Sequence, residues 1–263
     1  YPGAKIDRID KLPTPFGLVR FGVAPDHPDI KSVTENYTQL VKNNPSLKYY
    51  GNVELGKDID RAFLLENYDA VIYTTGGSLS KALPIAGGSL SGVYGSAEFV
   101  GWYNGHPEHA NLEPKLNKTT LSIIGMGNVA LDIARVVCLP KDELHATDIA
   151  EHALNAITNS KIKTVNLIAR KGPAQAAFTP KELRQLINHP GLRLEIDPKD
   201  LQLCESIEPS LALPKNSEAK ENIELLRGVL HSSQDHKSDA SKTIRFVFNS
   251  NPEEVIGTTR SVK

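Results

Sequence analysis

The chain has 263 residues, of which 40% are hydrophobic and 23% charged, and its 30 basic and 31 acidic side chains give a formal net charge of -1. This length suits two modest domains, each with its own core. The balanced charge argues against a general affinity for nucleic acids or membrane surfaces. Cys138 and Cys204 are too few for a disulfide framework, and the eight histidines show no HExxH-type pair, so no metal is expected. No apolar run approaches the eighteen or so residues of a membrane-spanning helix.

The first hundred residues indicate strands that alternate with helices, the pattern of an α/β fold with a largely parallel sheet. Strands are expected over residues 5–10, 49–55 and 68–75, the last one buried, and a helix over residues 30–42. Residues 13–28 are rich in proline and glycine and predict a stiff loop after the first strand. The polar stretch from 104 to 118 is the expected domain boundary.

The second part of the chain gives a clearer pattern. A strand over residues 119–124 leads through a glycine turn into a helix over residues 130–137, and a second strand is expected over residues 163–169. A helix over residues 179–187 and a short strand over residues 193–196 follow. The polar segment 209–242 is expected to hold one helix, over residues 222–231, between loops.

The turn after the first of these strands reads Gly125-Met126-Gly127-Asn128-Val129-Ala130. In a dinucleotide fold the first glycine permits the tight turn, the second lets the backbone approach a pyrophosphate, and the small third residue keeps the helix close to the sheet. Backbone amides at the helix start then face the anion. Because strand and helix flank the turn in the required order, the sequence favours a dinucleotide over an ordinary loop.

The next strand ends in Arg170-Lys171, where NAD sites usually carry an acidic residue for the ribose hydroxyls. Two cationic side chains instead favour a 2′-phosphate, which predicts NADP. A solvated basic pair is the alternative. The 45 positions between Gly125 and Arg170 exceed the usual spacing of about twenty, and the insertion 140–160 supplies the excess as extra helix.

Several long motifs in order resemble one known family. They are PTPFGLVRFGVAPDHP, Gly51-Asn52-Val53-Glu54-Leu55, FVGWYNG, GMGNVALDIAR, and the stretch from ARKGP to FTPKELR. Together they are similar to adrenodoxin reductase, the mitochondrial-type NADPH:ferredoxin reductase family of FAD enzymes, related in fold to glutathione reductase. The resemblance covers nearly the whole chain and fades after about Asp200.

The resemblance implies that NADPH gives a hydride to FAD, which passes electrons singly to a 2Fe–2S ferredoxin. It places Asp10, Leu18 and Leu55 at FAD contacts, with Asp10 standing where the family usually has glutamate. Residues at NADP contacts are Gly125, Met126, Gly127, Asn128, Val129, Arg170, Lys171 and Glu182; Lys171 replaces a second arginine. His27 and Asp132 match residues near the flavin and nicotinamide that can relay or orient a proton; the alternative is that His27 packs in its loop and Asp132 bonds backbone. Arg184 matches a family arginine that pairs with acidic groups on ferredoxin. The alternative is that Arg184 is an ordinary solvated charge on its helix.

The expected architecture is therefore a Rossmann-type NADP-binding domain over residues 106–263 and part of a glutathione-reductase-like FAD-binding domain over residues 1–105. The family's first strand with its glycine turn, and its C-terminal segment, are not in this sequence, so an internal portion of a reductase is expected and retention of FAD by this portion is doubted. Location is expected to be mitochondrial by resemblance. A non-catalytic NADP-binding or ferredoxin-docking protein remains the alternative. A flavin-free dehydrogenase ranks last, because the Tyr-x-x-x-Lys pattern is absent after the glycine turn.

Overall fold

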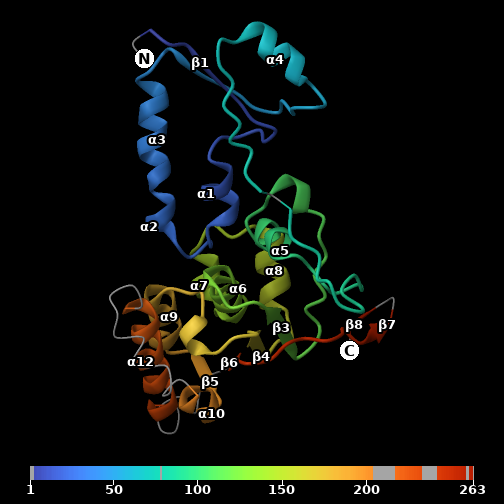
Figure 1. Ribbon diagram of the computed structural model, residues 1–263, viewed down its shortest axis with the longest axis vertical. Coiled ribbons are helices and arrows are strands. Elements are labelled where there is room, and N and C mark those ends of the chain that lie inside the picture. The colour runs from blue at the N-terminus through green and yellow to red at the C-terminus, as the bar shows by residue number, and fades with distance from the viewer. Residues whose placement is uncertain (1–2, 78, 204–216, 233–241, 259–260, 263) are drawn as a thin grey trace. The chain divides into compact units, whose positions relative to one another are not determined.

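The computed structural model describes residues 3–77, 79–203, 217–232, 242–258 and 261–262. The chain divides into two compact units: unit 1 comprises Tyr1–Val23 and His27–Leu79, and unit 2 comprises Ala24–Asp26 and Ser80–Lys263 (Figure 1). No helix among the described residues is long and apolar enough to cross a membrane. The boundary predicted between the FAD-binding and NADP-binding parts, at residues 105–106, stays a prediction.

Unit 1 is built on a two-stranded parallel sheet. Strand β1 pairs with β2 in the register Ile6↔Leu47 to Ile9↔Tyr50. Its elements in chain order are β1 (Ile6–Ile9), α1 (Gly17–Gly22), α2 (Pro28–Lys31), α3 (Val33–Lys42), β2 (Leu47–Tyr50) and α4 (Arg61–Asn67). The helix expected over residues 30–42 is thus two helices that meet at Ser32, and the strand expected from residue 49 begins and ends earlier.

The buried strand expected over residues 68–75 is wrong. The structure has no strand there, and Ile72 and Tyr73 are 84% and 52% exposed. A strand needs a neighbour for its backbone N–H and C=O groups. Strand β1 pairs only with β2 among the described residues, and none of the described strands pairs with residues 68–75. Among the described residues, the apolar segment therefore has no strand to pair with.

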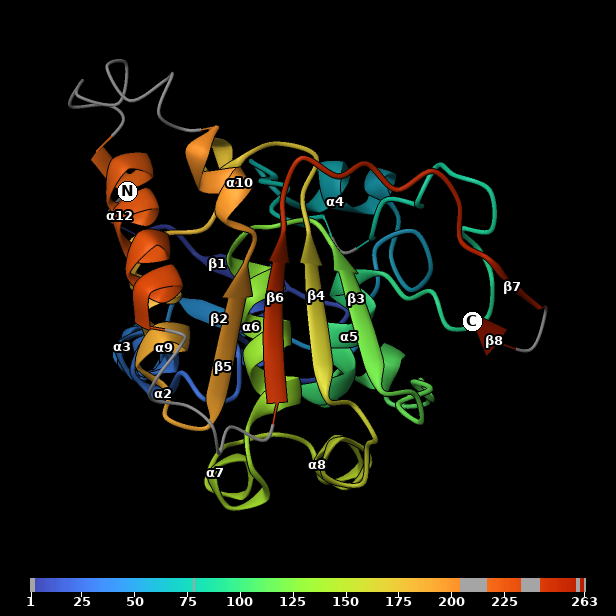
Figure 2. The same ribbon diagram turned by 90° about the horizontal axis from the view of Figure 1, so that it is seen from below.

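Unit 2 holds a four-stranded sheet in the order β3-β4-β6-β5, with every pair parallel. Figure 2 shows its four arrowheads at the same edge. Parallel strands need crossover connections, and helices supply them. The first elements are α5 (Ser96–Tyr103), the 3-10 helix η1 (Pro107–His109), β3 (Thr120–Ile124), α6 (Asn128–Cys138), α7 (Lys141–His145), α8 (Glu151–Thr158) and β4 (Thr164–Ile168). Helices α7 and α8 are the extra helices predicted for the insertion.

The remaining elements of unit 2 are the 3-10 helix η2 (Pro173–Gln175), α9 (Pro180–Asn188), β5 (Leu192–Ile196), α10 (Pro198–Gln202), α12 (Ser217–Ser232), β6 (Lys242–Val247), β7 (Gly257–Thr258) and β8 (Ser261–Val262). Strands β7 and β8 form an antiparallel pair. The sequence patterns do not predict β6, which lies between β4 and β5. The strand begins at Lys242, the last residue of the segment expected to be polar loop. Residues 209–216 and 233–241 of the polar segment lie outside the described residues, as do residues 204–208 with Cys204.

The hydrophobic core lies in unit 2 and joins the sheet to its helices. Val165, Leu167, Ile244 and Phe246 from the two central strands are at most 1% exposed. On α6, almost every residue from Ala130 to Cys138 is buried, Leu131 and Ala134 completely, as expected of a helix enclosed in a core. This core fixes the loops at the sheet edge, which is where functional groups of open α/β sheets gather.

Candidate nucleotide-binding site

The glycine turn joins β3 to α6 as predicted. Gly125 has a φ of +120°, and a Cβ at this position would meet no atom within 4 Å, so the backbone here both requires glycine and faces open space. Gly127 is the N-cap residue of α6 and places no side chain over the helix start. The first turn of this 11-residue helix contains no acidic side chain. Its first amides are thus arranged as an anion site requires.

The basic pair lies at the same edge of the sheet as the glycine turn. Ile124 and Ile168 are paired at the ends of β3 and β4, and the Gly125 amide donates to the carbonyl of Ile168 at 2.9 Å. Arg170 and Lys171 come one residue after the end of β4, and both are exposed. Within the described part of the chain, neither side chain forms an ion pair. The two cations therefore stand next to the turn with their charges facing solvent.

A second segment braces the turn. Asn128 Oδ1 accepts a hydrogen bond from the amide of Thr179 at 2.8 Å, and the Ala177 amide donates to the carbonyl of Met126 at 3.1 Å. Thr179 is the N-cap of α9. Val129, by contrast, is 49% exposed in the first turn of α6. The predicted contacts Met126 and Asn128 thus serve the backbone geometry of the turn, and Val129 lies on its open side.

A buried ion cluster lies on the same helix, around Arg135. This side chain is 4% exposed, and its Nε and Nη2 donate to the two carboxylate oxygens of Asp26 at 2.5 and 3.1 Å. Nη2 also donates to Asp132 Oδ1 at 2.8 Å, and Glu182 Oε2 lies 3.6 Å from Nη1. Burial alone would lower the pKa of Arg135, but the hydrogen bonds and charges of Asp26 and Asp132 raise it above its ordinary value.

This cluster assigns partners to two predicted site residues and adds three that sequence reasoning missed. Asp132 bonds the guanidinium of Arg135, whereas its alternative interpretation was a bond to backbone. Asp26, Arg135 and Tyr103 were missed; the only signal was a charged pair at i and i+3 inside an apolar helix face. The Tyr103 hydroxyl is fully buried without a hydrogen-bond partner among the described residues. Burial, with the charges of Asp132 and Asp26, raises its pKa.

The predicted flavin contacts belong to unit 1. Asp10 follows β1, where its Oδ1 accepts the amide of Leu12 at 3.0 Å and its Oδ2 lies 3.7 Å from Arg8 Nη2. Leu18 and Leu55 are 82% and 39% exposed. The position of Asp10 after a parallel strand is compatible with its predicted contact to the FAD ribose. The exposure of Leu18 and Leu55 leaves both side chains accessible to a flavin.

His27 is 8% exposed and is the N-cap residue of α2. It follows Asp26 directly in the chain. Asp26 itself belongs to unit 2, where Arg135 holds it, whereas His27 belongs to unit 1.

The predicted docking arginine is engaged within the chain. Arg184 lies on α9 and forms an ion pair with Glu221 of α12; the two side chains are 46% and 41% exposed. A partner's carboxylate would therefore compete with Glu221 for this guanidinium.

The site and the sheet define a class: an α/β protein with a Rossmann-type domain of the kind found in flavoprotein reductases. No protein-family model matches the chain. The chain is 41% identical over 259 residues to the mitochondrial NADPH:adrenodoxin oxidoreductase of Arabidopsis thaliana and 48% identical over 200 residues to that of Homo sapiens, matches that span 97% and 76% of the chain. It is 39% identical over 252 residues to the NADPH-ferredoxin reductase FprA of Mycobacterium tuberculosis.

Among solved structures, FprA of Mycobacterium tuberculosis in complex with NADPH superposes with a TM-score of 0.88 at 38% identity, over 96% of this chain and 54% of that one. The chain is thus homologous to the NADPH:adrenodoxin oxidoreductases and FprA, and the resemblance drawn from its motifs is confirmed. The chain spans about half the length of these relatives, 53% of the Arabidopsis protein and 54% of FprA.

Proposed function

We propose that this chain is the NADP-binding part, with an adjoining piece of the flavin-binding part, of an NADPH:ferredoxin oxidoreductase. The observation that carries the proposal is the placement of Arg170 and Lys171 beside the Gly125 turn at one edge of a parallel sheet. The turn offers backbone amides to a pyrophosphate, and the basic pair offers charge to a 2′-phosphate. The names of the relatives supply the reaction class.

We propose that the glycine turn binds the pyrophosphate of NADP and that the residues after β4 bind its 2′-phosphate. Gly125 and Gly127 admit the pyrophosphate to the start of α6, with Met126, Asn128 and Val129 forming the loop around it. Arg170 forms a two-pronged contact to the 2′-phosphate, and Lys171 adds a point charge. Glu182 belongs to the buried ion cluster around Arg135, where its Oε2 lies 3.6 Å from Arg135 Nη1. We assign it a further contact to the nucleotide.

FAD is proposed as the second cofactor. Asp10 would hold its ribose hydroxyls, and Leu18 and Leu55 would contact its apolar parts. The group converts two-electron hydride chemistry into single electron transfers when bound. The residues of this chain bind and orient: the carboxylate of Asp10 accepts hydroxyl hydrogen bonds, and the exposed leucines shield apolar surface from water.

His27 and Asp132 are proposed as the residues that handle protons in the reaction. An imidazole can hold or release a proton near neutral pH, and a carboxylate can orient it or a water. Asp132 is itself held by Arg135 at 2.8 Å. Asp132→Asn should slow NADPH oxidation and alter its pH profile while NADP affinity stays within about twofold of the native value.

A 2Fe–2S ferredoxin is the proposed electron acceptor, with Arg184 in its docking surface. Because Glu221 already pairs with Arg184, docking must exchange one carboxylate for another. Glu221→Gln should therefore lower the KM for ferredoxin and Arg184→Gln should raise it. Neither change should alter NADPH oxidation with a small inorganic acceptor.

We also propose a mitochondrial location, because several relatives are named as mitochondrial proteins. The FprA relatives are bacterial.

The test of the proposed function is NADPH-dependent cytochrome reduction by the full-length gene product, with a 2Fe–2S ferredoxin added. Turnover that needs the ferredoxin and prefers NADPH over NADH is expected. Arg170→Ala should raise the KM for NADPH about 10- to 100-fold with little change in kcat, as expected for a lost charge-assisted contact. The matched control is Lys118→Ala, which removes an exposed cation before β3, at the opposite edge. NADP binding without any turnover would favour a non-catalytic nucleotide-binding protein instead.

A further inference from the structure

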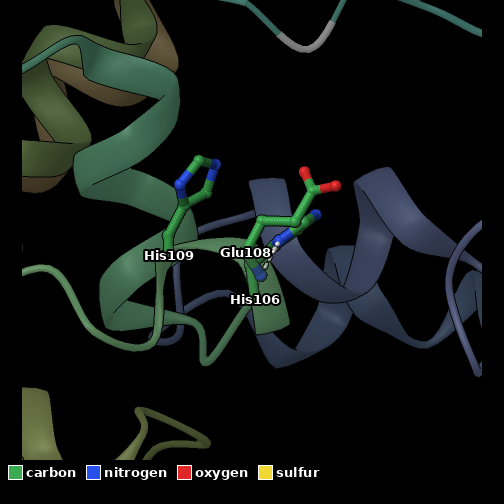
Figure 3. A group of neighbouring side chains, drawn as sticks. All are labelled: His106, Glu108 and His109. Atoms are coloured by element: carbon green, nitrogen blue, oxygen red, sulfur yellow. Dashed lines mark hydrogen bonds between the residues drawn. The ribbon is translucent and has the colours of Figure 1, made fainter.

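Two imidazoles and a carboxylate lie together on the 3-10 helix η1 and its N-cap residue. They belong to His106, Glu108 and His109, whose potential ligand atoms all lie within 4.8 Å of one another. Figure 3 shows the three side chains on a single short turn, with Glu108 directly beside the His106 ring. Both histidines are half-buried, and Glu108 is exposed. The nucleotide site described above uses none of these residues.

The turn has a rigid base in helix α5. The His106 amide donates to the carbonyl of Gly101 at 2.8 Å, and the His109 amide donates to the carbonyl of His106 at 2.9 Å. A Cβ on Gly101 would lie 2.5 Å from His109 Cδ2 and 3.2 Å from the His106 Cβ. Only glycine lets the histidines sit this close to a helix whose residues 99–103 are buried. The two rings are therefore held against the core.

The spacing of the rings suits one shared ion. Their centroids are 5.0 Å apart, at an interplanar angle of 36°. Two imidazoles bound to one tetrahedral zinc, with Zn–N distances of about 2.0 Å, have centroids roughly 5 Å apart. The Glu108 carboxylate supplies a third ligand from the residue between them. Ligation through His106 Nδ1 would replace the hydrogen bond that this nitrogen accepts from the Glu108 amide at 3.1 Å.

We propose that His106, Glu108 and His109 bind a divalent transition-metal ion of the Zn²⁺ and Cu²⁺ class, with water in the open position. Imidazole nitrogen with one carboxylate is a donor set for these borderline ions, whereas Mg²⁺ and Ca²⁺ prefer oxygen alone. The ion would stabilise the turn η1, which connects α5 to the segment that leads into β3. The site is independent of the proposed reductase function.

Local sequence patterns do not reveal this site, because the histidines are three apart without the HExxH pattern. On an α-helix a spacing of three or four places two side chains on one face. On a 3-10 turn, with three residues per turn, a spacing of three aligns them. The sequence gives only the spacing of three, and the structure adds that residues 107–109 form a helical turn, with His106 as its N-cap, which brings the two imidazoles together.

The experiment is a Zn²⁺ titration of the metal-stripped chain by calorimetry, repeated with Co²⁺ while its visible spectrum is recorded. One ion per chain, bound at micromolar concentration with a tetrahedral Co²⁺ spectrum, is expected. The variant His106→Gln/His109→Gln should lose at least about 100-fold in affinity, and Glu108→Gln about tenfold. His145→Gln, which removes an exposed histidine from α7, should bind as the native chain does. Affinity should fall on acidification, because metal ligands must be deprotonated.

Thermal unfolding gives a readout that does not rest on the variants' titrations alone. Excess Zn²⁺ should raise the Tm of the native chain and of His145→Gln, since a ligand that binds only the folded state stabilises it. The double variant should show no such rise while its circular dichroism stays native. Binding weaker than about millimolar, or a Zn²⁺ affinity that the double variant retains, would overturn the site.

Discussion

Arg135 on α6 holds Asp26 through two hydrogen bonds, from Nε at 2.5 Å and from Nη2 at 3.1 Å, across 109 positions of the chain. Through the same guanidinium Asp26 is tied to Asp132. Asp26 immediately precedes His27, so the helix that starts at the nucleotide turn also anchors the residue before a proposed proton carrier.

Loss of the Arg135 side chain should be the most destabilising single change in this cluster. Arg135→Met leaves the carboxylates of Asp26, Asp132 and Glu182 near one another without their cation, and breaking a buried ion pair in this way costs about 3–5 kcal/mol. Urea unfolding followed by circular dichroism measures it. Arg193→Met, which removes an arginine from the exposed pair with Glu195, should cost less than about 1 kcal/mol. Equal losses in the two variants would refute a special role for the buried cluster.

Gly125→Ala should impair both folding and nucleotide binding. Its φ of +120° lies outside the regions open to other residues, so the added methyl costs about 1–3 kcal/mol in backbone strain. The methyl also enters the open space that we assign to the pyrophosphate. Denaturant unfolding and an NADP titration should both register the change.

The matched substitution is Gly228→Ala in α12, where a Cβ would also meet nothing within 4 Å. Because this glycine is helical, alanine should stabilise the chain by about 0.5–1 kcal/mol and leave NADP affinity unchanged. A Gly125→Ala variant that binds NADP as well as the native chain would contradict the proposed approach of the pyrophosphate to this turn.

Cys138 should be almost unreactive in the native protein. Burial raises the pKa of its thiol to about 12, and the charge of Lys242 offsets this only in part. At pH 8 the thiolate fraction is then on the order of one in ten thousand, so alkylation should need unfolding of the core. A Cys204→Ser variant isolates the signal, and native-state labelling at the rate of an unfolded peptide would disprove the burial.

The same shift has a consequence for stability. A thiol whose folded pKa lies above its unfolded value of about 9 favours the folded state below that pH and loses this contribution as the pH rises toward 12. Cys138→Ala should therefore flatten the alkaline limb of a stability-against-pH curve. An unchanged slope between pH 9 and 11 would exclude Cys138 as its source.

The elements of unit 2 that carry their own local pattern were predictable. Strand β3, the Gly125 turn and α6 follow from an apolar run, two glycines and helical spacing, all short-range signals. Residues 68–75 carry a strand pattern as well, but a strand forms only beside a second strand that bonds its backbone N–H and C=O groups. The sequence of the segment does not show whether such a neighbour exists. The Arg135 cluster was unpredictable for the same reason, because Asp26 and Arg135 meet only in the fold.

The most direct test of the account is a titration of this chain with NADP and with NAD under the same conditions, after circular dichroism has shown it to be folded. Arg170 and Lys171 should make NADP bind at least about 10- to 100-fold more tightly than NAD, and Arg170→Ala should remove most of that difference while Lys118→Ala preserves it. Equal affinities for the two nucleotides, or no binding of either, would contradict the assignment of this sheet edge to NADP.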